Sequence, residues 1–215
     1  MFHIRGISAS SNTTKTLYVA EELGLDYEYT SMNLQDGEHK TPAHLARHPL
    51  GKLPTLSFGD KHLFESGAIC RYLADKEGRH LYPDADPYQR ATIDQWMNFF
   101  TCHLGRHINT YAFETFARER FGMGPPKEET VQEARGFIEQ QLPAVEQRLS
   151  ESKYIAGDAL TIADLYDFAY VENLEVTDLS LATFSATQAW YQGIKARESV
   201  QRTHARLGKR LCNLD

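Results

Sequence analysis

The stretch GKLPTLSFGDKHLFESGAICRYLADK, residues 51–76, decides the fold. Two short runs within it, PTLSF and HLF, are separated by the turn-forming residues Gly-Asp-Lys, a pattern typical of a β-hairpin. The following segment, SGAICRYLADKEG, has the periodicity of a helix. We expect Ser66 to be the N-cap of this helix, because serine is a preferred residue at that position. The sequence therefore predicts a hairpin that leads directly into a helix.

The fifty residues before this stretch change repeatedly between strand and helix patterns. FHIRGI and DYEYTSMNL are predicted strands, TKTLYVAEELGL is a helix that ends at Gly24, and TPAHLARHP is a short helix closed by proline. The predicted order is β-α-β-α-β-β-α. A strand–helix–strand start favours a parallel pair with a right-handed crossover, and the hairpin adds antiparallel strands. This is the layout of a thioredoxin-like domain, which we place at residues 1–79.

The rest of the chain shows helical patterns and no convincing strand. Residues 80–86 are rich in turn formers and are predicted to be a linker. Residues 87–215 contain four long segments with helical periodicity. The fold class is therefore α/β followed by all-α: an N-terminal thioredoxin-like domain and a C-terminal helical-bundle domain.

One helix of this second domain carries a clear start signal. Thr161 and Asp164 form the pattern T-x-x-D of a capping box. Leu160 and Leu165 stand at the two positions of a hydrophobic staple. We expect these residues to contribute to folding and to lie outside the functional site.

Composition and charge exclude several classes of protein. The 215 residues carry a formal net charge of −6, which gives no support to nucleic-acid binding. No apolar run approaches the roughly 20 residues of a membrane span, and MFHIRGISAS lacks the apolar core of a secretion signal. The three cysteines are widely spaced and form no CxxC pair, so neither a metal site nor a disulfide framework is expected. A reducing cytoplasm is the predicted location.

The residue types at the two ends of the hairpin are typical of a binding site. X-Pro bonds adopt the cis form more readily than other peptide bonds. A cis Pro54 would leave the N–H and C=O of Leu53 free to pair with an extended peptide, whereas a trans proline would merely start a strand. Glu65 and Ser66 stand at a helix N-terminus, which binds carboxylates. They either recognise the head of an α-amino acid or are a cap beside a surface glutamate.

GKLPTL, followed eleven residues after Pro54 by ESGAICRYLA, closely resembles the glutathione-binding core of the glutathione S-transferase superfamily. The resemblance implies a cis bond before Pro54 and pairing of the Leu53 backbone with the cysteinyl unit of glutathione. It also implies that Glu65 and Ser66 hold the γ-glutamyl end.

The upstream segment DGEHKTPAHLARHPLGKLP is similar to plant phi-type and bacterial members of this superfamily. The resemblance places His39 near the glycyl carboxylate of glutathione, with Lys40 beside it, and it places Lys52 near the same group. Read without the resemblance, His39 and Lys40 would be solvated surface residues.

The segment SASSNTTK, between the first strand and the first helix, contains the candidates for catalysis. The resemblance to phi-type enzymes implies that Ser10 donates a hydrogen bond to the thiolate of glutathione, with Ser11 as the alternative and Asn12 also held in reserve. A donor of this kind lowers the pKa of a thiol because it favours the charged form. These hydroxyls could instead simply cap the first helix. The segment has no tyrosine and no cysteine, which argues against alpha-, mu- or pi-like chemistry and against thiol–disulfide exchange.

The second substrate of this superfamily lies between the two domains. The resemblance makes Arg106, Tyr111 and Phe113, within NFFTCHLGRHINTYAF, candidates for lining that pocket. It implies a cytosolic, homodimeric transferase that detoxifies small electrophiles with glutathione as co-substrate and without a metal, with peroxide reduction as an additional candidate activity. The alternatives are a non-catalytic glutathione- or hydrophobic-ligand-binding protein of the same fold, or a glutathione-dependent isomerase or dehalogenase.

Overall fold

The computed structural model describes residues 1–208. Its N-terminal part is built on a four-stranded sheet in the spatial order β2-β1-β3-β4. β1 runs parallel to β2 and antiparallel to β3, and β3 runs antiparallel to β4. The strand order along the chain and the late hairpin are therefore confirmed. The four strands are β1 (Phe2–Gly6), β2 (Tyr27–Ser31), β3 (Thr55–Phe58) and β4 (Lys61–Phe64).

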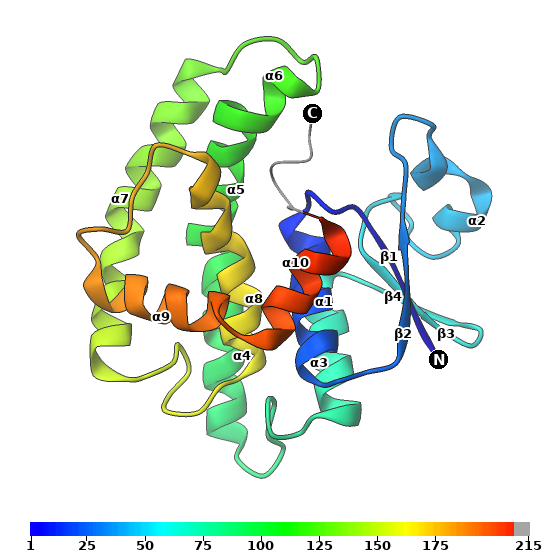
Figure 1. The fold of residues 1–215 in the computed structure, drawn as a ribbon, viewed down its shortest axis with the longest axis horizontal. Helices are drawn as coiled ribbons and strands as arrows, with labels where there is room; N and C mark the ends of the chain where they lie inside the picture. Colours follow the sequence, from blue (N-terminus) through cyan, green and yellow to red (C-terminus); the bar gives the residue numbers. More distant parts are fainter. Residues whose placement is uncertain (209–215) are drawn as a thin grey trace.

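Helices lie on both sides of this sheet, as in a thioredoxin-like domain. α1 (Ser11–Glu22) and α3 (Ser66–Glu77) pack against each other between the sheet and the helical half of the molecule (Figure 1). The 3₁₀ turn η1 (Glu38–Lys40) and the short helix α2 (Pro42–Leu45) lie on the far side. The sheet is thus enclosed between two layers, and α1 is the element between the two halves of the chain.

Helix α1 begins three residues earlier than its apolar pattern indicates. The sequence predicts a start at Thr14, but the first helical residue is Ser11. The polar first turn is helical because its side chains bond locally: the Thr14 hydroxyl donates to the Ser11 carbonyl at 3.1 Å. Ser10 is at the N-cap, yet its hydroxyl makes no capping hydrogen bond. The helix therefore starts directly after Ser10.

The predicted cap of α3 is corrected by the structure. Ser66 is the first helical residue, and the N-cap is Glu65, with φ 68° and ψ 113° and no side-chain capping bond. The reason is geometric: β4 ends at Phe64 and the chain must turn sharply into α3. Glu65 alone adopts the backbone conformation that makes this turn.

The rest of the described chain is helical and contains no further strand up to residue 208, which confirms the predicted fold class. Cys212 and residues 209–215 of the predicted helical domain lie outside the described residues. None of the helices within residues 1–208 has the length and apolar character that crossing a membrane requires. The elements are α4 (Pro87–Cys102), α5 (Leu104–Ala112), the π-helical turn η2 (Phe113–Ala117), α6 (Arg118–Arg120), α7 (Glu128–Glu151), α8 (Ile162–Val171), the 3₁₀ turn η3 (Glu172–Val176), α9 (Ser185–Lys195) and α10 (Glu198–Leu207).

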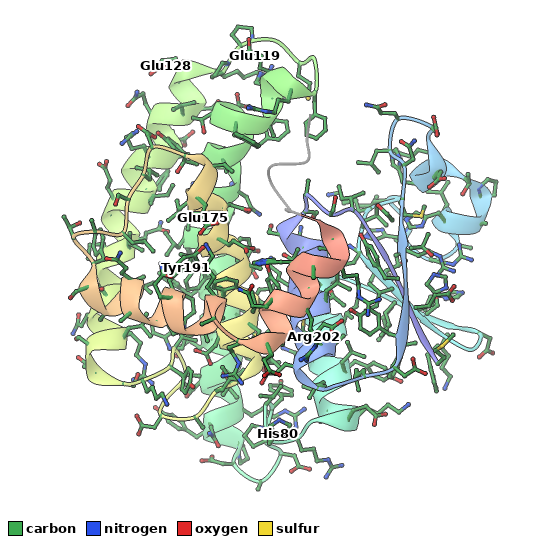
Figure 2. All side chains as sticks on the ribbon, in the orientation of Figure 1. His80, Glu119, Glu128, Glu175, Tyr191 and Arg202 are labelled. Carbon is green, nitrogen blue, oxygen red and sulfur yellow. The ribbon has the colours of Figure 1, made fainter. Side chains whose placement is uncertain are left out.

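Helix α10 was not predicted, and several of its contacts to α1 are between charged groups. Arg197 pairs with Glu22, and Arg202 pairs with Glu21 at 2.9 Å. Figure 2 shows Arg202 on α10 where this helix crosses α1. The Ser199 hydroxyl also donates to Glu22 at 2.5 Å. The last described helix is therefore fixed to the helix that begins beside Ser10.

The capping box at the start of α8 is confirmed. The Asp164 carboxylate accepts hydrogen bonds from the Thr161 N–H at 2.9 Å and the Thr161 hydroxyl at 3.1 Å. It also accepts from the Ile155 N–H at 2.8 Å and the Trp190 indole at 3.0 Å. Because Asp164 is fully buried, these donors replace the water that it loses on folding. Their role is structural.

We expect Thr161→Ala to lower the free energy of unfolding by about 0.5–2 kcal/mol, the usual effect of losing an N-cap side chain. Urea unfolding followed by circular dichroism measures this change. Thr183→Ala is the matched control, because Thr183 is exposed and outside any helix. Equal midpoints for the two variants would contradict the assigned role of Thr161.

Candidate active site

The strand register gathers three chain segments at one edge of the sheet. Arg5 of β1 pairs with Thr55 of β3, and Thr55 pairs with Phe64 of β4. Because β3 is antiparallel to both neighbours, its start lies beside the end of β1 and the end of β4. The segments that follow β1, precede β3 and follow β4 therefore meet at this edge.

The segment that precedes β3 contains a cis peptide bond between Leu53 and Pro54. Of the two readings that the sequence left open, the cis form is the one present. Pro54 is buried and Leu53 is half-buried. Within residues 1–208, neither the N–H nor the C=O of Leu53 pairs with a backbone group of the turns and loops. Both groups are available to an extended ligand.

The segment that follows β4 places an acidic residue in an unusual backbone conformation. Glu65 has a positive φ of 68°, a region that costs a non-glycine residue about 1–3 kcal/mol and is often found at functional sites. Its side chain is exposed, whereas Ser66 is buried in the first turn of α3. The first turn of a helix has backbone N–H groups without helical partners. An acid, a hydroxyl and free amides thus lie next to Leu53.

The basic residues of the upstream segment are brought to the same region through Gly51. A Cβ atom at Gly51 would lie 2.3 Å from the His39 carbonyl oxygen, so the two segments are in direct contact. The Lys52 carbonyl accepts a hydrogen bond from the His44 ring at 3.0 Å. The Lys52 side chain is exposed. His39 is half-buried, and its Nδ1 has no partner among the described residues. The site therefore has a cationic side.

The segment that follows β1 contains the two candidate serines, and their surroundings differ. Ser11 is 5% exposed, and its hydroxyl donates to Asn109 Oδ1 at 3.1 Å. Ser10 is half-buried at the N-cap, and its hydroxyl has no hydrogen-bond partner among the described residues. Asn12 Oδ1 accepts from Lys15 Nζ at 2.7 Å. Of the two serine hydroxyls, that of Ser10 is free to donate to a ligand, whereas that of Ser11 is already bonded to Asn109.

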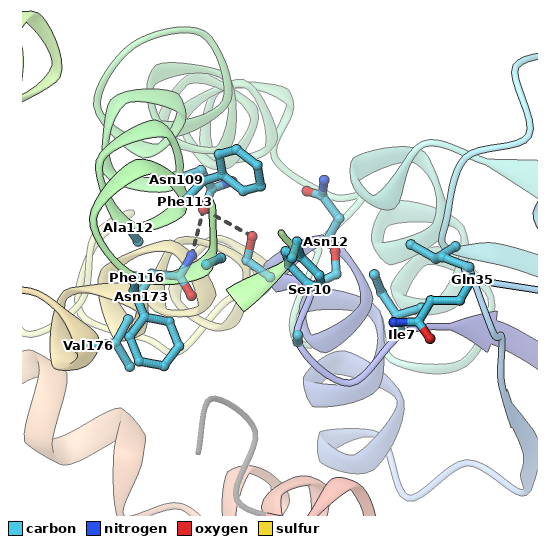
Figure 3. Close-up of a pocket in the computed structure, with 15 residues that line it drawn as sticks. Ile7, Ser10, Asn12, Gln35, Asn109, Ala112, Phe113, Phe116, Asn173 and Val176 are labelled. Atoms are coloured by element: carbon cyan, nitrogen blue, oxygen red, sulfur yellow. Dashed lines mark hydrogen bonds between the residues drawn. The ribbon is translucent and has the colours of Figure 1, made fainter. Parts of the chain in front are cut away.

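A cavity of about 550 Å³ opens beside these serines, between the sheet domain and the helical domain (Figure 3). Its walls are mostly apolar, and none of the described residues that line it is charged. Ser10 and Ser11 are on one side and helix α5 with the π-turn η2 is on the other. The lining residues are Ile7, Ala9, Ser10, Ser11, Asn12, Leu34, Gln35, Asn109, Ala112, Phe113, Phe116, Ala117, Phe121, Asn173 and Val176.

Of the three residues predicted for this pocket, the structure brings Phe113 to the cavity wall. Arg106 is exposed and does not line it. Tyr111 is buried on another side of α5, where its hydroxyl donates to Asp178 at 2.6 Å. Sequence reasoning missed Asn109 and Phe116. Their spacing from Phe113, four and three residues, is the signal for one helix face.

The only cysteine of the quoted motif is not a reactive group. Burial raises the pKa of the Cys70 thiol to about 12. A thiol in this state has almost no thiolate at neutral pH, and the thiolate is the nucleophilic form. The Cys70 thiol is therefore not a nucleophile at this site.

Comparison with known proteins decides the family. Residues 2–75 match the family model described as "Glutathione S-transferase, N-terminal domain", and residues 99–198 match "Glutathione S-transferase, C-terminal domain". The chain belongs to the glutathione S-transferase family. A probable glutathione S-transferase of Oryza sativa subsp. japonica is 35% identical over 199 residues, which cover 92% of this chain and 93% of that protein. Glutathione S-transferase 1 of Zea mays is 34% identical and covers 93% of this chain and 94% of its own length.

Solved structures of glutathione S-transferases agree with this family assignment. Glutathione S-transferase I bound to lactoylglutathione has a TM-score of 0.89 and 33% sequence identity, and the match covers 95% of this chain and 98% of that chain. The enzyme from maize in complex with an atrazine glutathione conjugate has the same TM-score and identity, with 96% and 97% covered. The described fold and the family thus agree along nearly the whole chain.

Gly51 allows a direct test of the cationic side. In Gly51→Ala the new Cβ would clash with the His39 backbone, so we expect His39 and Lys52 to be displaced. The affinity for glutathione, measured by calorimetry, should fall about tenfold or more, which is ~1.4 kcal/mol.

Gly59→Ala is the matched control for this experiment. Gly59 also has a positive φ, 61°, but no atom lies within 4 Å of the position that a Cβ would occupy there. Both variants carry the backbone strain of an alanine at positive φ, and only one carries the clash. The same loss of affinity in both would show that contact between Gly51 and His39 has no role in binding.

Proposed function

We propose that this chain is a glutathione S-transferase enzyme that joins the thiolate of glutathione to small electrophiles. The observation that carries the proposal is the meeting of four features at one sheet edge: a cis proline, a strained glutamate, a free serine hydroxyl and an apolar cavity. The first two suit the backbone and the amino-acid head of a tripeptide. The last two suit its sulfur and a second substrate.

Glutathione would bind across the edge of the sheet in an extended form. The N–H and C=O of Leu53, preceding Pro54, pair with the cysteinyl unit in the manner of an added strand. Glu65 attracts the γ-glutamyl ammonium, while Ser66 and the first N–H groups of α3 bind its carboxylate. His39 and Lys52 attract the glycyl carboxylate at the other end. The two ends of an anionic peptide thus meet groups of suitable charge.

This binding mode brings the sulfur to the start of α1. An ordinary thiol has a pKa near 8.5 and loses its proton to solvent only partly at neutral pH. The Ser10 hydroxyl and the partial positive charge of the α1 N-terminus both favour the thiolate. The thiolate then attacks an electrophilic carbon in the cavity, forming the S–C bond while the leaving group departs with its electron pair. Ser10 donates one hydrogen bond and does not itself act as a nucleophile.

The finer features of the proposal are a homodimer and a cytoplasmic location. The rings of Phe58 and Phe64 are 37% and 40% exposed on the β3–β4 hairpin, and β4 is an edge strand of the sheet. Exposed apolar groups at such an edge favour burial against a second copy. Cys70 and Cys102 are free thiols, which suits a reducing compartment. The proposed role in the cell is detoxification of electrophiles.

A ligand-binding protein without turnover is the second candidate, because the cavity is apolar and large enough for a small molecule. The two candidates differ at the sulfur. A carrier has no need to ionise the thiol of glutathione, whereas a transferase must do so.

We therefore expect the pKa of enzyme-bound glutathione to lie well below 8.5 and Ser10→Ala to raise it. A hydrogen bond to a charged acceptor contributes about 1.5–3 kcal/mol, and a pKa unit corresponds to about 1.4 kcal/mol. The expected rise is therefore about 1–2 units. Titration of thiolate absorbance at saturating glutathione measures it, and the conjugation rate at neutral pH should fall accordingly.

Two further serine variants complete this experiment. Ser150→Ala, on the exposed face of α7, is the control and should leave the thiol pKa unchanged. In Ser11→Ala the thiol pKa should rise less than in Ser10→Ala, because the Ser11 hydroxyl already donates to Asn109. If Ser11→Ala has the larger effect, the assignment of Ser10 is wrong. A bound thiol with an ordinary pKa would favour the carrier.

A further inference from the structure

The outer face of the sheet, opposite helices α1 and α3, carries a group of ionisable side chains. Side chains alternate along a strand, so His3 and Arg5 of β1 point away from the face that buries Phe2 and Ile4. The Phe2 ring packs against Tyr72 of α3. His3 and Arg5 therefore lie on the side of the sheet where α2 is found (Figure 1).

The guanidinium of Arg5 is fixed by neutral acceptors. Its Nη1 donates to Ser57 Oγ of β3 at 3.0 Å, and its Nη2 donates to His3 Nδ1 at 2.9 Å. Because a guanidinium can only donate, His3 Nδ1 must accept, and His3 Nε2 donates its proton to Thr30 Oγ1 of β2 at 2.7 Å. The Ser57 hydroxyl also shares a hydrogen bond with His62 Nδ1 of β4 at 3.0 Å. Side chains from all four strands thus hold Arg5 without neutralising its charge.

A second guanidinium, that of Arg47, comes from the segment that follows α2. Its Nη1 donates to the Ala43 carbonyl at 2.7 Å, and its Nε is buried without a partner among the described residues. Burial lowers the pKa of the Arg5 guanidinium, and the positive charge of Arg47 lowers that pKa further. The two positive charges are therefore close enough to repel each other.

Glu28 is the acid that faces this cluster, and it is poorly placed to neutralise the two arginines. Its carboxylate lies 3.5 Å from His3 Nδ1, and its side chain is 57% exposed. Within residues 1–208, no carboxylate forms an ion pair with Arg5 or Arg47. Both arginines are half-buried, and a buried charge is costly unless it is paired. The cluster therefore favours an anion that binds from solution.

We propose that Arg5 and Arg47 bind a phosphate group, either as free phosphate or as a phosphate monoester, on the outer face of the sheet. The fork of N–H groups on an arginine matches two oxygens of a phosphate. A phosphate with a second pKa of about 6 is mainly a dianion at neutral pH, so it can neutralise both guanidiniums, whereas a carboxylate neutralises one. His3 and Ser57 are positioning residues that hold Arg5. The inference goes beyond the proposed function, because none of these residues belongs to the glutathione site or the cavity.

Calorimetry of the unmodified protein tests this proposal, with inorganic phosphate and glycerol phosphate as the two titrants. Ionic strength is held constant with sodium chloride, because salt screens exposed charges. We expect saturable binding of one phosphate group per chain, with and without saturating glutathione. Binding of both titrants would support recognition of the phosphate group alone. Binding of free phosphate alone would support a site that excludes the ester, and binding of glycerol phosphate alone would support a site that also contacts the ester.

Charge-changing variants locate the bound phosphate. Arg5→Gln and Arg47→Gln should each weaken binding about tenfold or more, the usual effect of losing charge-assisted hydrogen bonds. Glu28→Gln should instead strengthen binding about twofold or more, because it removes a nearby negative charge. This variant keeps the proposal testable if Arg5→Gln does not fold, since Glu28 is exposed. Arg79→Gln is the matched control: Arg79 is exposed and already pairs with Asp84, so its loss should leave binding unchanged.

Several results would overturn the proposal. No saturable heat with either titrant would mean that the cluster is not a phosphate site. Equal affinity in the unmodified protein, Arg5→Gln and Arg47→Gln would mean that phosphate binds elsewhere. Loss of phosphate binding on addition of glutathione would mean that phosphate occupies the cationic side of the glutathione site. An equal loss of affinity in Arg79→Gln, or weaker binding in Glu28→Gln, would mean that the local charge of the cluster does not determine binding.

Discussion

The structure depends on the burial of helix α1 on all sides. Its residues Ser11 and Thr13 to Glu21 are buried, because α3 and the sheet cover one face and α8 and α10 cover the others. Two of its large polar side chains have partners within this interface: Tyr18 donates to Glu172 at 2.7 Å, and Lys15 Nζ lies 3.3 Å from the ring centre of Tyr170. A helix enclosed in this way cannot shift without breaking contacts in both domains. The position of Ser10, at its N-cap, is fixed accordingly.

The groups that suit the peptide and those that form the cavity lie on opposite sides of helix α1. The sheet edge supplies backbone groups at Leu53 and an acid at Glu65, which suit a peptide of defined length and charge. The helical domain supplies the apolar wall of the cavity, where the π-turn η2 brings Phe113 and Phe116 to one surface. The arrangement separates recognition of one substrate from selection of the other.

Local patterns predicted the sheet domain well because its elements are short and its turn residues are specific. The hairpin, the proline and the following helix were recognisable within residues 51–76. The N-cap of α3 was misassigned, because the positive φ at Glu65 results from the sharp turn between β4 and α3, which the local sequence does not indicate. Helix α10 was not predicted because few of its residues are apolar, Val200 and Leu207 among them, and its contacts to Glu21 and Glu22 are ionic.

The residues that line the cavity were harder to predict from the sequence than those at the sheet edge. Asn109 and Asn173 meet across 64 residues, and nothing in either local sequence indicates this contact. Tyr111 was a reasonable aromatic candidate, yet it lies two residues from Asn109 on the helix, which corresponds to the opposite side.

The measurement that tests the account most directly is a crystal structure with glutathione bound. The account predicts the sulfur within hydrogen-bonding distance of the Ser10 hydroxyl and the cysteinyl backbone paired with Leu53. A sulfur nearest another side chain, or an empty groove at saturating glutathione, would contradict it.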